Sequence, residues 1–284
     1  MIWVGGRLVP NDGLKIDVSD RTFEHGLGLF ETLRTQNGRA PLLDRHLARM
    51  ERSARELGLP FDPVVKPDAK AVLNLVEAEG LGGDVLVRIT LTGGLAETSG
   101  ATLWMRVAPL PPPARPGGIV VAVGPWRVLR DDRFARFKSL NYWSRRAAFE
   151  TARRLGFDEV LSLTDDGCVW EGSRTNLFAV RGATLITPSL DGPLVPGIMR
   201  GLVLELARGL SLSVDEAKEL RRDDLAGADE VFLTNSVRGI VPVTRVVASG
   251  PDEATHQWPA PGPWTRRLAL AASDRLWQTG ETTP

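Results

Sequence analysis

Lys138 is the residue in this chain best suited to act as a nucleophile. It lies in the segment Phe137-Lys-Ser-Leu-Asn-Tyr142, and only five of the 35 basic residues are lysines. A lysine beside an aromatic residue, in a loop between a strand and a helix, can be desolvated, and a desolvated amine can form a Schiff base with an aldehyde. Tyr142 is the only tyrosine of the chain and follows four residues later. The segment is therefore compatible with carbonyl chemistry at Lys138.

A carboxylate motif, Glu171-Gly-Ser-Arg-Thr-Asn-Leu-Phe178, follows Lys138 in the chain. Lysine plus carboxylate suits pyridoxal phosphate, because an acid must keep its ring nitrogen protonated and its phosphate needs arginine, hydroxyl or helix-amide donors. Spacing alone does not establish this cofactor. The residues that could supply these groups are Glu171, Arg49, Ser236 and the amides of Ile198 and Met199.

Motifs of several other enzyme classes are missing from the sequence. The three histidines, His25, His46 and His256, form no His-Glu-x-x-His or Cys-His pattern, so we predict no metal site. There is no Gly-x-Ser-x-Gly elbow and no phosphate loop. Gly26-Leu-Gly28 begins like a dinucleotide loop but has Glu31 in place of the third glycine. Zinc hydrolase, serine hydrolase, NAD-dependent and nucleotide triphosphatase activities are therefore disfavoured.

Composition favours small-molecule chemistry over binding to a polymer or a membrane. The chain has 284 residues with 35 basic and 35 acidic side chains, so no net charge attracts it to nucleic acid or to an acidic membrane. Cys168 is the only cysteine, which excludes an intramolecular disulfide, and the N-terminus lacks a signal-peptide pattern. We expect a cytoplasmic protein with no membrane span.

The hydrophobic pattern predicts a mixed α+β unit in the first part of the chain. Residues 2–9 and 15–18 alternate around Gly and Asn-Asp-Gly, which predicts a hairpin. Apolar residues at helical spacing predict a helix over 42–57, with Gly58 as its stop. The other expected elements are a helix at 68–79 and strands at 29–36, 85–92 and 102–108.

A connector rich in proline and glycine predicts the domain boundary. Residues 109–118 contain five prolines and two glycines, which cannot continue a helix or a central strand. We place an N-terminal α+β domain at 1–114, the connector at 109–118 and a cofactor-binding domain at 119–284. In the second domain we expect helices at 142–155 and 196–209 and strands at 119–129, 159–164, 175–180, 184–187 and 230–234, then an extended segment to 247. The tail from Gly250 is not assigned.

Eight segments in the same order resemble the fold-type IV pyridoxal-phosphate enzymes, which include branched-chain and D-amino acid aminotransferases and aminodeoxychorismate lyase. The resemblance extends over about residues 2–247. The matching segments are Ser19-Asp-Arg, Gly28-Leu-Phe-Glu-Thr-Leu-Arg34, His46-Leu-Ala-Arg49, Lys138-Ser-Leu-Asn-Tyr142, Gly156-Phe-Asp-Glu159, Glu171-Gly-Ser-Arg-Thr-Asn-Leu-Phe178, Gly197-Ile-Met-Arg200 and Thr234-Asn-Ser236. It implies an α/β (α+β) fold, with a small N-terminal α+β domain and a larger C-terminal α/β barrel-like domain.

The resemblance also implies how pyridoxal 5'-phosphate is held. It makes Lys138 the Schiff-base lysine and proton shuttle, Glu171 the partner of the pyridine nitrogen and Tyr142 a donor to the phenolic oxygen. The remaining cofactor-binding residues that it implies are Arg49, Asn176, Ile198, Met199 and Ser236. Packing in the core is the alternative role for Tyr142. Many of the aminotransferases have threonine where this chain has Met199, and the lyases often have methionine.

On the substrate side, the resemblance implies the residues His25, Phe30, Thr32, Arg88 and Val237. Arg88 aligns with a basic residue that reaches a substrate carboxylate from the partner subunit in several relatives. A structural ion pair is the alternative role for Arg88. The loop Thr92-Gly-Gly-Leu-Ala-Glu-Thr lacks the additional arginine that D-amino acid aminotransferases and the lyases tend to carry. The substrate therefore stays open.

Together these observations predict a homodimeric aminotransferase, of the branched-chain or D-amino acid type, that moves an amino group between an amino acid and a 2-oxo acid. The dimer, with its active site at the subunit interface, is implied by the resemblance alone. A lyase that releases pyruvate from 4-amino-4-deoxychorismate is the second hypothesis, because of Met199 and the segment from Lys138 to Asn141. A non-catalytic ligand-binding protein is the third.

Overall fold

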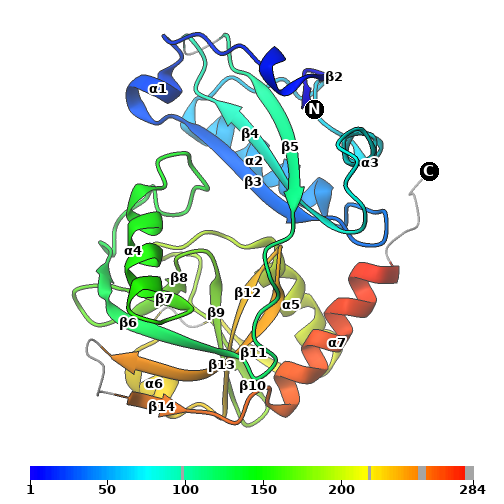
Figure 1. Ribbon diagram of the computed structural model, residues 1–284. Coiled ribbons are helices and arrows are strands. Elements are labelled where there is room, and N and C mark those ends of the chain that lie inside the picture. The colour runs from blue at the N-terminus through cyan, green and yellow to red at the C-terminus, as the bar shows by residue number, and fades with distance from the viewer. Residues whose placement is uncertain (97–98, 217–218, 249–253, 279–284) are drawn as a thin grey trace. The chain divides into compact units, whose positions relative to one another are not determined.

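A computed structural model describes residues 1–96, 99–216, 219–248 and 254–278, and its chain divides into two compact units (Figure 1). The first unit comprises Met1–Pro112, Phe137–Tyr142 and the chain from Arg275, and the second comprises Pro113–Arg136 and Trp143–Asp274. The segment that contains Lys138 and Tyr142 thus belongs to the first unit, although it lies far along the sequence.

The first unit is an antiparallel sheet with helices packed on it. Its strands are β1 (Ile2–Val4), β2 (Arg7–Val9), β3 (Gly28–Arg34), β4 (Val85–Thr92) and β5 (Leu103–Pro109), in the spatial order β2-β1-β5-β4-β3. Its helices are the 3-10 turn η1 (Asn11–Gly13), α1 (Arg21–His25), α2 (Leu43–Leu57) and α3 (Ala69–Ala78). The predicted strand 85–92 and the predicted helix 42–57 are confirmed, and Gly58 ends that helix in the left-handed conformation.

One face of this sheet forms the core of the first unit. Alternate residues of the strands, such as Leu29, Leu33, Val87, Ile89 and Met105, are buried together with apolar residues of α2 and α3. The core residues that α2 contributes are Leu43, Leu47, Met50 and Ala54. Because successive side chains of a strand point to opposite faces, the residues between these core positions face away from the core.

The N-terminal hairpin forms at a different place from the one predicted. β1 and β2 pair around Gly5 and Gly6, which both have positive φ, as a two-residue hairpin turn requires. Residues 15–18 form no strand, so that part of the prediction is wrong. The Asn-Asp-Gly signal belongs to the 3-10 turn η1, which follows Pro10.

The segment that contains Lys138 extends the sheet beyond β3. The Phe30 N–H donates to the Lys138 carbonyl at 2.9 Å, and the Leu140 N–H donates to the Gly28 carbonyl at 3.0 Å. Leu29 and Ser139 lie opposite each other as an antiparallel bridge between these two hydrogen bonds. Lys138 is therefore the cross-strand neighbour of Phe30, and the two side chains share the face that is turned away from the core.

The second unit is built around a closed ring of strands. Its strands are β6 (Ile119–Arg127), β7 (Glu159–Leu163), β8 (Val169–Gly172), β9 (Asn176–Arg181), β10 (Thr184–Ile186), β11 (Ser213–Asp215), β12 (Glu230–Asn235), β13 (Gly239–Ala248) and β14 (Ala254–Gln257). The ring has the order β9-β12-β13-β6-β7-β8 and closes because β8 pairs with β9 as well as with β7. The expected barrel-like domain is confirmed.

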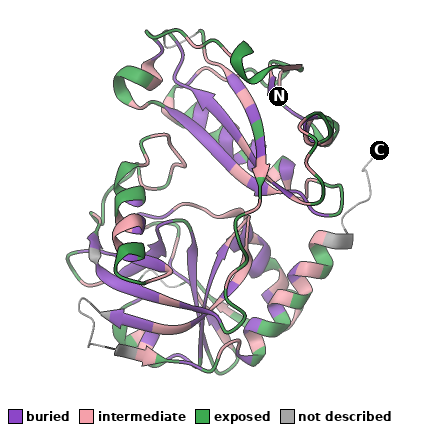
Figure 2. Ribbon diagram, viewed as in Figure 1, coloured by how far each residue is buried: buried purple, intermediate pink, exposed green. Residues whose placement is uncertain are grey.

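Residues alternate between the inside and the outside of this barrel. Val121 and Leu233 belong to the apolar cluster inside it, together with Leu161, Leu177 and Val231. The helices α4 (Trp143–Arg154), α5 (Ile198–Gly209), α6 (Arg222–Ala226) and α7 (Pro263–Gln278) surround the strands. Phe178 and Phe232 stack with their ring centres 5.0 Å apart, in a cluster with residues of α5 and α7. Figure 2 shows the barrel strands largely buried and α4 exposed on its outer side.

Several elements of the second unit escaped the sequence analysis. β8, which carries Glu171, is short and buried throughout, so it shows no alternation of apolar and polar residues. Helix α7 lies in the tail that was left unassigned. None of the helices within the described residues is both long and apolar enough to span a membrane.

Gly28 permits the close approach of the Lys138 segment to β3. Its φ is +134°, and a Cβ built there would lie 2.6 Å from both the Leu140 Cδ1 atom and the Leu91 carbonyl oxygen. We predict that Gly28→Ala lowers the free energy of unfolding by about 1–3 kcal/mol, because of backbone strain and overpacking. Thermal unfolding measures this. Gly38→Ala is the control, since Gly38 has φ +69° but open space around it. Equal losses in both variants would contradict the steric argument.

Candidate active site

The amine of Lys138 lies against an aromatic pair. Its Nζ atom is 4.4 Å from the centre of the Phe30 ring and 5.7 Å from the centre of the Tyr142 ring. These two rings meet edge to face, with centres 5.1 Å apart and an interplanar angle of 84°. Phe30 is buried, so the amine lies beside a surface with little access to water. Lys138 itself is of intermediate exposure, so its desolvation stays a prediction.

Arg88, on the neighbouring strand β4, also contacts the Phe30 ring. Its guanidinium carbon is 3.9 Å from the centre of the Phe30 ring, which is cation–π geometry. In the pairing of β3 with β4, Arg88 lies directly opposite Thr32. Partial burial lowers the pKa of Arg88, and the nearby charge of Arg106 lowers it further.

The structure thus brings five of the predicted residues onto one face of the first unit's sheet: Lys138, Tyr142, Phe30, Thr32 and Arg88. His25 differs from them. It ends α1, its side chain is 63% exposed, and its Nε2 atom lies 3.8 Å from the Glu24 carboxylate. Binding of substrate by His25 stays a prediction.

The core face of β3 carries a buried ionic cluster of Glu31, His46 and Arg49. The His46 Nδ1 atom lies 2.6 Å from Glu31 Oε2, and Arg49 donates to both carboxylate oxygens, from Nε at 2.8 Å and from a terminal nitrogen at 2.5 Å. His46 and Arg49 lie three residues apart, so helix α2 presents both to Glu31. Arg49, the predicted phosphate ligand, is thus oriented by a carboxylate that the sequence analysis did not select.

The electrostatics of this cluster favour an ionised carboxylate. Burial opposes the charge on Glu31, but Arg49 and His46 outweigh it and lower the pKa of Glu31 to about 2. Burial lowers the pKa of His46, against the influence of Glu31, so the imidazole is neutral near pH 7. A neutral His46 that donates from Nδ1 has Nε2 as an acceptor, and this atom is buried without a partner among the described residues.

In the second unit, Glu171 is a buried carboxylate with partners on both oxygens. A terminal nitrogen of Arg145, on α4, donates to Oε1, and the Val195 N–H donates to Oε2 at 3.1 Å. Arg145 also donates to the Ala135 carbonyl at 3.1 Å. Arg145 supplies the counter-charge that a carboxylate buried at this position needs. The sequence predicted Glu171 but gave no sign of Arg145, which is an ordinary position on a predicted helix.

Asn176 connects Glu171 to the start of α5. It lies opposite Glu171 in the pairing of β8 with β9, and its side-chain nitrogen donates to the Val195 carbonyl at 2.9 Å. A Cβ at Gly197 would lie 1.8 Å from the Asn176 Oδ1 atom, so any other residue here would force the Asn176 side chain to move. Gly197 is the N-cap of α5 and has no side chain that could cap the helix. No side-chain cap therefore binds the backbone N–H groups of the first turn, which includes Ile198 and Met199.

Ser236 and Val237 lie in the turn between β12 and β13. The Asn235 Oδ1 atom accepts the N–H groups of Val237 at 3.0 Å and Arg238 at 2.8 Å, which fixes the turn. Thr234 precedes this turn and lies opposite Asn176 in the sheet. Its hydroxyl is buried with no partner among the described residues, although the sequence analysis had selected Ser236 as the hydroxyl donor. The roles of Ser236 and Val237 stay predictions.

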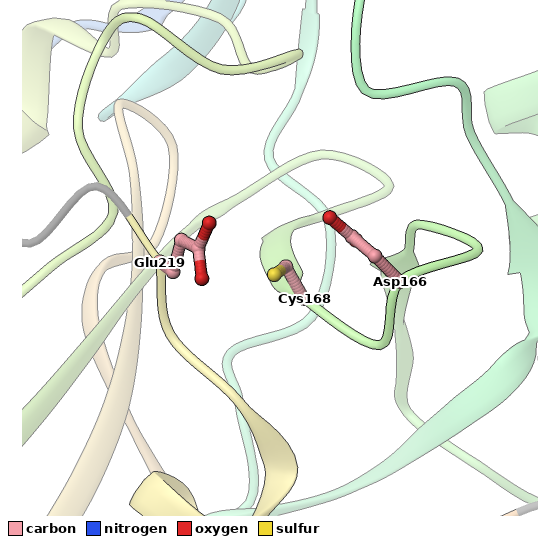
Figure 3. Close-up of side chains that lie close together, drawn as sticks. All are labelled: Asp166, Cys168 and Glu219. Carbon is pink, nitrogen blue, oxygen red and sulfur yellow. The ribbon is translucent and has the colours of Figure 1, made fainter.

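Asp166, Cys168 and Glu219 form a further cluster (Figure 3). One potential metal-ligand atom from each residue lies within 4.8 Å of the other two, which is close enough to hold a metal ion. Arg130 already bridges it. Its Nε atom donates to Asp166 at 2.6 Å, and a terminal nitrogen donates to the Cys168 sulfur at 3.1 Å and to Glu219 at 3.0 Å. A guanidinium in contact with all three groups opposes a second cation, so we interpret the cluster as a surface ion-pair network.

Comparison with known proteins identifies the family. The profile of the family described as amino-transferase class IV matches residues 28–246, which include every predicted site residue except His25. The chain therefore belongs to the class IV aminotransferase family.

The relatives include both of the activities expected from the sequence. The chain is 30% identical to a putative branched-chain-amino-acid aminotransferase of Methanocaldococcus jannaschii, over 86% of this chain and 87% of the relative. It is also 30% identical to the aminodeoxychorismate lyase of Bacillus subtilis, over 87% of this chain and 86% of that protein. Among solved structures, a branched-chain aminotransferase from Thermoproteus uzoniensis with norvaline matches with a TM-score of 0.85 and 28% identity, covering 98% of this chain and 95% of that one.

Replacing Glu31 tests the buried cluster. We predict that Glu31→Gln lowers the free energy of unfolding by about 3–5 kcal/mol at pH 7, because the variant leaves Arg49 buried without its counter-charge. The pKa of Glu31 is lowered from 4.5 to about 2, so its stabilising effect is complete above about pH 4.5 and disappears as the pH falls toward 2. The difference between wild type and variant should therefore shrink by about 3 kcal/mol over this range.

Urea unfolding at a series of acidic pH values measures this difference. Glu24→Gln is the control, because its side chain is 56% exposed. A gap between wild type and Glu31→Gln that does not change with pH would show that Glu31 is not ionised in the folded protein.

Cys168 gives an independent test of the ion-pair network. It is fully buried, and burial together with Asp166 and Glu219 raises the pKa of its thiol. We predict that a thiol reagent at pH 8 labels it only after unfolding in guanidinium chloride, because the thiolate is the reactive form. Since the chain has a single cysteine, the labelled fraction reports this site alone. Rapid labelling of the folded protein would show that the site opens or that the thiol is ionised.

Proposed function

We propose that this protein is a pyridoxal-phosphate-dependent aminotransferase that moves an amino group between an amino acid and a 2-oxo acid. The observation that carries this proposal is the amine of Lys138, which lies 4.4 Å from the Phe30 ring on the face that also presents Arg88. A nucleophilic amine and a cation for a carboxylate are what binding and deprotonating an amino acid require. Membership of the class IV family supports the same reaction class.

The residues present fit pyridoxal phosphate on structural grounds. Glu171 is a buried carboxylate, and its oxygens can accept a hydrogen bond from a protonated ring nitrogen in addition to those from Arg145 and the Val195 N–H. The uncapped start of α5 at Gly197 suits a phosphate, because first-turn amides and the helix dipole favour anions. The unpartnered hydroxyl of Thr234 lies on the strand next to Asn176 and suits a phosphate acceptor. When bound, pyridoxal phosphate supplies an electron sink for the charge that develops at the substrate's α-carbon.

Each side chain then has a distinct task. Lys138 binds the cofactor through its amine and moves the proton at the substrate α-carbon, and Glu171 holds the proton on the ring nitrogen. Arg88 orients the substrate carboxylate, and the Phe30 ring keeps water away from the Lys138 amine. Arg49, oriented by Glu31, is proposed to bind the phosphate. Holding these charges fixed before reaction lowers the barrier, since little reorganisation is then needed.

We further propose that the active protein is a homodimer and that it is cytoplasmic, and an exposed apolar surface supports the dimer. Exposed apolar side chains occur around α1 and the loop that follows β4, where Phe23 is 60% exposed and Leu95 is 50% exposed. The Arg21 side chain connects these two segments by donating to the Gly93 and Ala96 carbonyls. A second copy of the chain is the natural cover for such a surface, and analytical ultracentrifugation tests this.

Aminodeoxychorismate lyase activity is the second candidate. It is favoured by Met199 in the first turn of α5, where a side-chain hydroxyl would otherwise be available to a phosphate. The equal identity to the lyase of Bacillus subtilis and to the aminotransferase relative supports keeping it. Release of pyruvate from aminodeoxychorismate without any 2-oxo acid acceptor would identify the lyase. Amino transfer that needs an acceptor would identify the aminotransferase.

Replacing Lys138 tests the proposal directly. We predict that wild-type protein incubated with pyridoxal phosphate is yellow, and that Lys138→Ala loses both the visible absorbance of the lysine-bound cofactor and at least about a thousandfold of its turnover. Lys70→Ala is the control, because Lys70 is an exposed lysine of the same unit.

Circular dichroism of both variants checks that they are folded. A Lys138→Ala protein that keeps the absorbance and the turnover would remove Lys138 from the site. A colourless wild-type protein after reconstitution would favour the non-catalytic ligand-binding alternative.

A further inference from the structure

Arg145 is a buried arginine in the first turn of helix α4. Its neighbour Arg146 is exposed and forms an ion pair with Glu150 one turn along the helix, which is ordinary for a surface arginine. A cation in the first turn opposes the helix dipole, and a buried charge is costly unless it is paired. The stability of α4 therefore does not account for a buried arginine at position 145.

Three contacts fix the guanidinium of Arg145 within the second unit. One of its terminal nitrogens donates to the Ala135 carbonyl at 3.1 Å and also to Glu171 Oε1. Its guanidinium carbon lies 5.4 Å from the centre of the ring of Trp126, a buried residue of β6, which is within the range of a cation–π contact. Because these partners belong to three separate segments, they hold the guanidinium in one place beside Glu171.

Glu171 is fixed at its backbone and at both side-chain oxygens. Its N–H donates to the Ser162 hydroxyl oxygen at 3.3 Å, and that hydroxyl donates to the Glu171 carbonyl at 3.2 Å. The side-chain oxygens accept from Arg145 and from the Val195 N–H. A carboxylate offers about four acceptor positions, so it can accept a further donor. Arg145 thus helps to orient the carboxylate and leaves it able to bind another group.

The charge of Arg145 also acts on the form of Glu171. Burial alone favours the neutral form of a carboxylic acid, whereas an opposite charge at hydrogen-bond distance favours the ionised form. An ionised carboxylate accepts a hydrogen bond from a protonated ring nitrogen, but a neutral acid carries the proton itself. The contact with Arg145 therefore favours the form of Glu171 that a protonated ring nitrogen needs.

We propose that Arg145 is a positioning residue for pyridoxal phosphate, which keeps Glu171 ionised and oriented toward the ring nitrogen of the cofactor. This rests on the proposed function in one respect: Glu171 is taken to be the partner of the ring nitrogen. Without Arg145, the buried Glu171 would lose its counter-charge, so it would take up a proton or turn toward another donor. In either case the ring nitrogen would be bound less tightly.

An analogue of the cofactor with C–H in place of the ring nitrogen, 1-deazapyridoxal 5'-phosphate, provides the test. It keeps the aldehyde and the phosphate, so only the contact with Glu171 is lost. Titration calorimetry with the full-length protein, freed of cofactor, measures the affinity for both compounds. We expect the wild type to bind pyridoxal phosphate about tenfold more tightly than the analogue, and Glu171→Gln to remove this preference. Arg145→Gln should remove most of it and change the affinity for the analogue by less than about twofold.

Arg146→Gln is the charge-matched control, because Arg146 lies on the same helix with its side chain 63% exposed, and it should keep the full preference. Arg145→Lys is the milder variant if Arg145→Gln does not fold. It should bind the analogue like the wild type and keep part of the preference, since lysine keeps the charge without the planar group. In whichever variant is folded, an unchanged preference would overturn the proposal. So would an equal loss of affinity for both compounds, which would indicate a structural role.

Amino transfer by the same samples separates this proposal from the proposed function. A protein that transfers amino groups, but in which Arg145→Gln weakens both compounds equally, would overturn the role of Arg145 and leave the aminotransferase proposal intact. A protein that transfers no amino group, but whose preference for pyridoxal phosphate depends on Arg145, would overturn the aminotransferase proposal and support the role of Arg145. A wild type that does not prefer pyridoxal phosphate over the analogue would overturn the role of Arg145.

Discussion

The pairing of residues 138–140 with the edge of β3 is the interaction on which the candidate site depends. Two backbone hydrogen bonds, from Phe30 to Lys138 and from Leu140 to Gly28, fix the register of a segment that is remote in sequence. Register decides the face on which a side chain emerges, and a shift of one residue would turn Lys138 toward the core. The requirement for glycine at position 28 follows from the same close approach.

Strand β3 separates two kinds of chemistry on its two faces. On the core side, Glu31 holds His46 and Arg49 in a buried ionic cluster. On the other side, Phe30 lies between the amine of Lys138 and the guanidinium of Arg88. Strand β3 (Gly28–Arg34) therefore orients the proposed phosphate ligand Arg49 through Glu31. The adjacent residue, Phe30, contacts the proposed nucleophile Lys138. The alternation of a strand makes this possible without any specialised loop.

The sequence allowed much of the fold to be predicted, and it selected several residues that the structure brings together. β4 and α2 were predicted correctly because their hydrophobic periods are regular. Lys138 and Glu171 were selected because their neighbours form ordered motifs. Arg145 was missed because its pairing with Glu171 joins a helix to a strand, and nothing local marks such a pair. Arg106, whose charge lowers the pKa of Arg88, was missed for a different reason. An arginine that alternates with apolar residues in a strand resembles an ordinary solvent-facing position, and only the register with β4 places it beside Arg88.

The most direct test of this account is to locate the lysine that binds pyridoxal phosphate. Wild-type protein incubated with the cofactor is reduced with borohydride, which makes the attachment permanent, then digested and mapped by mass spectrometry. The account predicts modification of Lys138 alone among the five lysines of the chain. Modification at another lysine, or none at all, would contradict the central claim that the β3 edge presents the reactive amine.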